Sequence, residues 1–219
     1  MNIYITRMGI TRCYIIRDEG TIMVDSGPPN KLNNFIKSMQ KASIDPKQIK
    51  LIVNTHGHYD HIGSTKVIKD HTGAQIAMHE PDKEWLEKSI NPPIPGVNTW
   101  GKILIKLLPQ PHIVETSVDI KLGDEDFSLA PFGIPGSVVY TPGHTMGSVS
   151  VLLKNGDAFI GDLAMSGFPL RLNPGLPIFA EDIKRVKDSL RKLLEKGARI
   201  FYPGHGKPFP TDNISKLLA

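Results

Sequence analysis

The sequence has little cysteine and no long apolar run. Cys13 is the single cysteine among 219 residues, which excludes an internal disulfide framework and a zinc ribbon built from several cysteines. No apolar run approaches the ~20 residues that a membrane-spanning helix needs. The N-terminus also lacks the basic and apolar regions of a signal peptide. We therefore expect a cytoplasmic chain without a membrane span.

An excess of charge of one sign is also lacking. The 26 Lys and Arg outnumber the 22 Asp and Glu only slightly, and the net charge is +4. The basic residues are spread along the chain among acidic ones, so we expect a solvated surface and no nucleic-acid partner. The length and a hydrophobic content of 40% fit one globular domain over residues 1–219. The oligomeric state stays open, with a homodimer as one alternative.

Short strands alternate with helices along the chain. Apolar residues at helical spacing predict helices over residues 32–39 and 181–196, the last ending at Gly197. A further helix is predicted over residues 62–70, before the strand at 75–78. Such alternation favours layered sheets that are covered by helices. Runs of strand-forming residues predict strands at 3–5, 13–16, 21–24, 51–53, 75–78, 137–140, 149–153, 158–160 and 199–202.

Residues 81–132 fit this alternation less well, and we expect a helical insertion there. A proline-rich break at 91–96 precedes an apolar stripe at helical spacing, and further prolines at 109 and 111 follow it. Two interpretations stay open: a helix packed on the core, or a lid over the site that prefers substrates with an apolar acyl chain. The stripe consists of Trp100, Ile103, Leu104, Leu107 and Leu108.

Three histidines and one aspartate lie within six residues, directly after the predicted strand at 51–53. Residues two apart in an extended chain point the same way, so His56 and His58 can hold one cation. Asp60 and His61 then turn toward a second cation. Imidazole with carboxylate suits zinc or iron, whereas calcium and magnesium sites are built mainly from oxygen. The cluster predicts metal binding, since its polar groups would otherwise lack partners.

Three further residues of ligand type follow apolar strands on glycine-flanked turns. They are His144, Asp162 and His205. Loops held by a rigid sheet are where sites usually form, so these residues can complete two coordination spheres with the first cluster. We interpret the isolated histidines as ordinary surface or core residues, namely His71, His79 and His112.

The ordered motifs His-x-His-x-Asp-His, Gly-His, Gly-Asp and Gly-His resemble those of the metallo-β-lactamase-fold metallohydrolases. The resemblance covers Asp25 to His205, nearly the whole chain. It implies an α/β (α+β) fold, a four-layer αββα sandwich with the site at one edge of the two sheets. Asp25 matches the family's early Asp motif, which implies that it supports the ligand loop; an ordinary turn aspartate is the alternative.

The resemblance also implies the metal ligands. Asp162 would bridge two ions, and its presence together with His61 is similar to the glyoxalase II, lactonase and RNase Z types. The zinc β-lactamases lack such a bridging aspartate, so a β-lactam is not the expected substrate. The first ion would be held by His56, His58 and His144, and the second by Asp60, His61 and His205.

The function implied is a dinuclear metal-dependent hydrolase of a small-molecule ester, thioester or lactone, acting through a metal-bridging hydroxide. Metal binding can bring the pKa of water to about 7. Zinc is the expected metal, with iron and manganese as alternatives. Asp60 and Asp162 are the expected catalytic carboxylates. A mononuclear iron persulfide dioxygenase and a phosphodiesterase of the same fold are the alternative functions.

Overall fold

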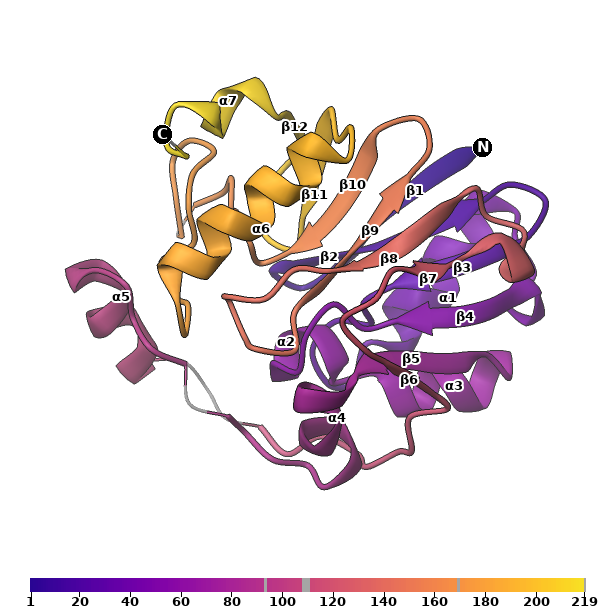
Figure 1. The fold of residues 1–219 in the computed structure, drawn as a ribbon. Helices are drawn as coiled ribbons and strands as arrows, with labels where there is room; N and C mark the ends of the chain where they lie inside the picture. Colours follow the sequence, from indigo (N-terminus) through magenta and orange to yellow (C-terminus); the bar gives the residue numbers. More distant parts are fainter. Residues whose placement is uncertain (93, 108–110, 169, 219) are drawn as a thin grey trace.

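The chain builds two β-sheets that face each other (Figure 1). The computed structural model describes residues 1–92, 94–107, 111–168 and 170–218. Within these residues the first sheet has six strands in sequential order: β1 (Asn2–Met8), β2 (Thr11–Arg17), β3 (Thr21–Val24), β4 (Ile49–Val53), β5 (Gln75–His79) and β6 (Ile120–Leu122). The neighbours from β3 to β6 pair in parallel, and β1 to β3 pair antiparallel.

The second sheet also has six strands within the described residues. They are β7 (Phe127–Ser128), β8 (Gly136–Tyr140), β9 (Val149–Leu153), β10 (Asp157–Gly161), β11 (Ile200–Pro203) and β12 (Phe209–Pro210). Their order in the sheet is β12-β11-β10-β9-β8-β7, and all pairs are antiparallel except that of β10 with β11. The predicted strands at 3–5 through 199–202 all lie within, or overlap, these elements.

Apolar side chains fill the space between the two sheets. Tyr14, Ile22 and Leu51 of the first sheet share one buried cluster with Val151 and Phe159 of the second. Side chains alternate along a strand, so the neighbours of Tyr14 on β2 point to the opposite face of the first sheet. Complete burial of side chains of this size stabilises the fold by about 1.5–3 kcal/mol each.

Helices cover the outer faces of both sheets. Phe35 and Met39 of α1 (Leu32–Ala42), with α3 (Thr65–Thr72), pack on the first sheet. Leu190 and Leu193 of α6 (Ile183–Glu195) pack on the second. The Asp182 side chain accepts hydrogen bonds from two backbone N–H groups at the start of α6. The four-layer αββα sandwich expected from the resemblance is therefore confirmed (Figure 1).

The helix predicted over 62–70 is two helices, α2 (Tyr59–Ile62) and α3. The break lies at Gly63 and Ser64, where the loop after β3 crosses closely. A Cβ atom on Gly63 would lie 2.4 Å from Cδ of Pro29. The Ser64 hydroxyl donates to the Pro28 carbonyl and accepts from the Lys31 N–H, so it bonds to this loop. The break depends on contacts with a loop that is distant in the sequence, so the local sequence did not reveal it.

Both ends of the segment 81–132 belong to the sandwich. In α4 (Glu80–Glu87), Leu86 packs with Ile76 and Met78 of β5. Strand β6 is the edge strand of the first sheet and pairs with β5, and β7 is the edge strand of the second sheet and pairs with β8. The part set apart from the sheets in Figure 1 holds α5 (Thr99–Leu104) and the short helix η2 (Ile105–Leu107). The proposal of an insertion therefore narrows to this part.

The described residues of the predicted stripe lie on α5 and η2 and are divided between solvent and protein. Trp100, Ile103 and Leu107 are exposed, whereas Leu104 packs in a small cluster around Ile178. Leu108 and residues 109 and 110 lie outside the described residues. The remaining short helices are η1 (Pro46–Gln48), η3 (Ala130–Phe132) and α7 (Asp212–Ser215). Across the described residues, each helix is too short or too polar to cross a membrane.

Candidate metal centre

Seven His and Asp side chains meet at one edge of the sandwich, where strands of both sheets end. The loop after β4 and helix α2 supply four of them, and the loops after β8, β10 and β11 supply one each. The structure thus brings together all seven residues singled out in the sequence: His56, His58, Asp60, His61, His144, Asp162 and His205. Among the described residues, the groups able to hold an ion include none of His71, His79 and His112.

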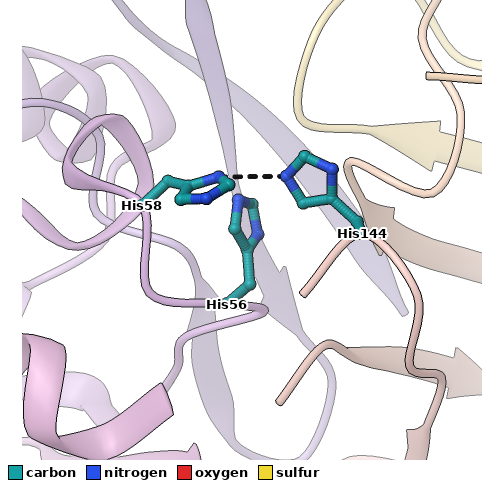
Figure 2. A group of neighbouring side chains, drawn as sticks. All are labelled: His56, His58 and His144. Atoms are coloured by element: carbon teal, nitrogen blue, oxygen red, sulfur yellow. Dashed lines mark hydrogen bonds between the residues drawn. The ribbon is translucent and has the colours of Figure 1, made fainter. Parts of the chain in front are cut away.

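His56, His58 and His144 form the first group (Figure 2). One ligand atom from each lies within 4.8 Å of the other two, and Nδ1 of His58 is 3.0 Å from Nε2 of His144. The Nδ1 atom of His144 lies 2.9 Å from the Phe179 carbonyl, which accepts its proton and leaves Nε2 toward the centre. Burial lowers the pKa of all three imidazoles, to about 3 for His58. They are therefore neutral, as metal ligands must be.

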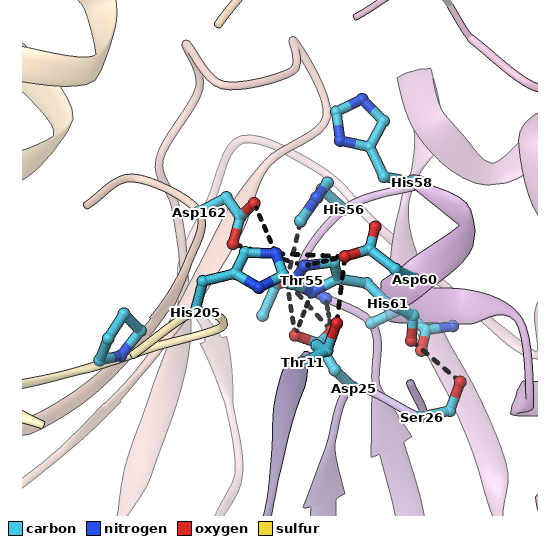
Figure 3. A network of polar contacts seen from close by, with 12 residues as sticks. Thr11, Asp25, Ser26, Thr55, His56, His58, Asp60, His61, Asp162 and His205 are labelled. Carbon is cyan, nitrogen blue, oxygen red and sulfur yellow. Dashed lines mark hydrogen bonds and ion pairs between the residues drawn. The ribbon is translucent and has the colours of Figure 1, made fainter. Parts of the chain in front are cut away.

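Asp60, His61 and His205 form the second group (Figure 3). Oδ2 of Asp60 lies 3.1 Å from Nε2 of His205 and 3.8 Å from Nε2 of His61. The Thr11 hydroxyl donates to the same carboxylate oxygen over 3.0 Å. Nδ1 of His205 faces the Ile10 carbonyl at 3.2 Å, so its Nε2 points into the centre. The tip of the β1–β2 hairpin therefore orients two residues of this group.

Asp162 lies between the two groups. Its Oδ2 atom is 3.3 Å from Nε2 of His205 and 3.7 Å from Nε2 of His144, and its Oδ1 atom is 3.4 Å from Nε2 of His61. One carboxylate thus reaches histidines of both groups. Such an arrangement can hold one ion or share a ligand between two neighbouring ions.

Two buried carboxylates, Asp60 of the second group and the neighbouring Asp162, concentrate negative charge at the centre. Burial would raise the pKa of the Asp60 and Asp162 carboxyls, but His61 and His205 outweigh it and lower both pKa values. Burial would likewise lower the pKa of His61 and His205, yet the carboxylates hold the first well above its usual value and raise the second to about 10. The carboxylates therefore require positive charge beside them, which a divalent cation supplies.

Unpartnered buried atoms test whether a metal fits. Nε2 of His56, Nε2 of His61 and Oδ1 of Asp162 are buried and make no hydrogen bond. Each such atom costs about 1–3 kcal/mol when nothing compensates it, and native proteins contain few of them. Here all three are ligand atoms of one potential site. The His and Asp residues are therefore positioned to bind metal ions.

A comparison with known families agrees with this geometry. The family model described as the metallo-beta-lactamase superfamily matches residues 6–205. The chain belongs to this superfamily. The resemblance inferred from the motifs is confirmed, and the superfamily includes relatives that are named hydrolases.

Three similar proteins illustrate the range of the superfamily. The chain is 30% identical over 157 residues to Probable metallo-hydrolase YqgX of Bacillus subtilis, across 70% of this chain and 65% of that relative. It is 26% identical over 195 residues to Hydroxyacylglutathione hydrolase of Pelagibacter ubique, across 88% of this chain and 65% of that relative. The chain thus spans just under two thirds of either relative. The BLEG-1 B3 metallo-beta-lactamase structure shares the fold, with a TM-score of 0.73 and 21% identity over 97% of this chain and 95% of that one.

Asp25, which resembles the superfamily's early Asp motif, contacts His61 of the second group on the ring nitrogen that faces away from the centre. Its Oδ2 atom lies 2.8 Å from Nδ1 of His61, and its carboxylate also accepts from the N–H and the hydroxyl of Thr55. The contact directs Nε2 of His61 toward the centre. The backbone of Asp25 has a φ of 58°, a region that residues with a side chain rarely adopt.

Asp82 on α4 connects the two ligand loops and is not among the residues singled out in the sequence. The buried carboxylate accepts from the N–H of Gly57 at 2.9 Å, the Thr145 hydroxyl at 2.7 Å and the N–H of Gly147 at 3.0 Å. It therefore ties the loop of His56 and His58 to the loop of His144. Burial raises its pKa to about 6 against these donors. An acid in the first turn of a helix is ordinary, so no local signal marks Asp82.

Close backbone approach explains one of the glycines beside the ligands. A Cβ atom on Gly204 would lie 2.4 Å from Cε1 of His61 and 2.7 Å from Oδ1 of Asp162. A side chain there would displace both residues. Gly204 thus lets the loop after β11 bring His205 up to the second group.

Proposed function

We propose that the chain is a hydrolase that uses two divalent metal ions to cleave an ester, thioester or lactone bond. The position of Asp162 carries this proposal, because its carboxylate is within 3.7 Å of His144 and within 3.4 Å of His61 and His205. Two ions that share one bridging carboxylate require a group that reaches both sides of the centre.

The proposed ligand assignment follows the two groups. Bound ions would lower the pKa of a coordinated water to about 7 and polarise the scissile carbonyl. Asp25 holds His61 in the orientation needed, and Thr11 fixes the rotation of Asp60. Asp60 and Asp162 are the carboxylates proposed to accept and transfer the proton of the coordinated water. Zinc suits the donor set, with iron and manganese as alternatives. The first ion would be held by His56, His58 and His144, the second by Asp60, His61 and His205, and Asp162 would be shared by both.

The proposed substrate carries an apolar acyl chain on its reacting carbonyl. A small cavity of about 30 Å³ lies at the centre, and its walls include Ile94, Leu170 and Phe179 as well as ligands. Leu104 of α5 packs against the cluster to which Phe179 belongs. We propose that the segment holding α5 acts as a lid that covers the acyl group of a small-molecule substrate.

Metal analysis followed by a substrate screen tests the proposal. Protein purified without chelator is expected to hold two metal ions per chain and to hydrolyse thioesters or lactones. His61→Ala and His205→Ala are expected to reduce the metal content. One tightly bound iron per chain, with uptake of O₂ on a persulfide, would instead identify the dioxygenase. Turnover of phosphodiesters alone would identify the phosphodiesterase.

A further inference from the structure

A groove of about 510 Å³ opens beside the metal centre. Three of its lining residues, Ile10, Leu170 and His205, also line the small cavity at the centre. The groove and the cavity therefore adjoin, and one molecule can occupy both. A substrate with its scissile bond at the centre would extend into this groove.

Three cations line the groove, and its lining residues include no acid. They are Arg7, Arg12 and Lys207. Arg7 and Arg12 are cross-strand partners in the β1–β2 hairpin, so their side chains lie on the same face. Lys207 follows His205 by two residues. Across the described part of the chain, no carboxylate forms an ion pair with any of these three side chains.

This local charge is unfavourable unless an anion neutralises it. Like charges directly opposite each other on paired strands destabilise a sheet. Burial lowers the pKa of Arg12, and the charge of Arg7 adds to the effect, but a guanidinium stays charged in proteins. The backbone N–H of Arg12 donates to the Gly204 carbonyl at 2.7 Å, so the main chain of the hairpin is anchored beside the ligand His205. The hairpin thus presents two arginines next to the metal centre, and neither forms an ion pair with a carboxylate of the described residues.

We propose that the groove binds an oxyanion group of the substrate, a carboxylate or a phosphate, while the reacting bond lies at the metal centre. Arginine suits this task because its planar fork donates two parallel hydrogen bonds to such a group. The apolar walls formed by Leu104, Phe168 and Leu172 can contact the carbon skeleton between the two ends. This inference rests on the proposed hydrolase function and names the substrate class as anionic.

Matched substrates test the inference. Three thioesters share one acyl group, and their leaving thiol carries a carboxylate, a phosphate or a neutral primary amide. With the zinc-loaded protein, kcat/KM for at least one charged thioester is expected to exceed that for the amide by about tenfold, since hydrogen bonds to charged groups are strong. The better charged substrate identifies the anion. In the double variant Arg7→Gln, Arg12→Gln this ratio is expected to fall to about one.

A matched control and a binding measurement separate the possible failures. Arg17→Gln changes an arginine at the far end of β2 and is expected to leave the ratio as in the wild type. Inorganic phosphate is titrated into zinc-loaded wild type and the double variant, and about tenfold weaker binding is expected for the variant. If the double variant fails to fold, Lys207→Gln on the exposed loop replaces it in both measurements.

The outcomes are distinguishable. A ratio near one in a wild type that hydrolyses all three thioesters overturns the anion site and leaves the hydrolase proposal intact. Absence of hydrolysis of every thioester and lactone contradicts the hydrolase proposal. In that case the phosphate titration still decides: equal affinities of wild type and variant overturn the anion site, and weaker binding by the variant supports it.

Discussion

The Asp162 carboxylate carries the first prediction, at the scale of one residue. Asp162→Ala is expected to lower kcat by ~100-fold or more, because a misplacement of about 1 Å in the reacting groups can cost that much. The fold should persist, since the side chain lies at the edge of the sandwich and not in its core. Steady-state kinetics and circular dichroism check both statements. Turnover at the wild-type rate by a folded variant would refute the bridging role.

Asp82 carries the second prediction. Asp82→Asn places an amide NH₂ among three hydrogen-bond donors, so at least one donor loses its acceptor. Partners that orient ligands typically contribute 10–100-fold to metal affinity, and we expect a weakening of about that size. Competition with a chromogenic chelator measures it. Glu84→Gln, an exposed acid on the same helix, is the control and should bind metal like the wild type. Equal affinities in all three proteins would argue against Asp82 as a positioning residue.

The residues that could be read from the sequence are those with a local pattern. His56, His58 and His61 lie close together after an apolar stretch, and the strand predicted there places them at its carboxyl end. Asp82 and the pair of arginines carry no such pattern. Asp82 is 63 residues from Thr145, and Arg7 becomes the neighbour of Arg12 only through the register of a hairpin. Contacts that depend on tertiary packing have no local pattern by which a single sequence could predict them.

At the scale of an element, α5 carries the third prediction. If the segment holding it covers an acyl group, each added methylene should contribute about 0.8 kcal/mol, so kcat/KM should rise with chain length. Leu104→Asp is expected to flatten this rise, because Leu104 packs beside the centre. Ile103→Asp changes an exposed residue of the same helix and should leave the rise unchanged. A homologous series of thioesters measures it; a flat profile in the wild type would exclude the lid.

Elements were predicted well where side-chain pattern and end signals agree. Helix α6 has a continuous apolar stripe and Asp182 at its start, and the prediction of 181–196 differs from it by two residues at the start and one at the end. The strands β6 and β7 contain three and two residues, too few for any alternation to be visible. They were therefore absorbed into the predicted insertion, although pairing with longer neighbours defines them.

At the scale of the whole molecule, the metal centre joins the two sheets. Four of its residues come from the first sheet and its loops, and His144, Asp162 and His205 come from the second. Ions that bind only the folded chain stabilise it, by about 2.7 kcal/mol at a free concentration one hundred times the dissociation constant. Removal of metal with a chelator is therefore expected to lower Tm, and added zinc to restore it. An unchanged Tm after complete removal, verified by elemental analysis, would contradict this role.

The contact between His205 and the Ile10 carbonyl joins parts of the chain that are 195 residues apart. The hairpin that contacts His205 is synthesised well before the loop after β11, so the centre can close only once residue 205 has been made. A nascent chain that ends before β8 carries only His56, His58, Asp60 and His61, so it lacks the three residues that the loops of the second sheet supply. Because contacts between distant residues form slowly, maturation of the centre is a late event in folding. The seven residues of the candidate metal centre therefore come together only when the β1–β2 hairpin and the loop after β11 have met.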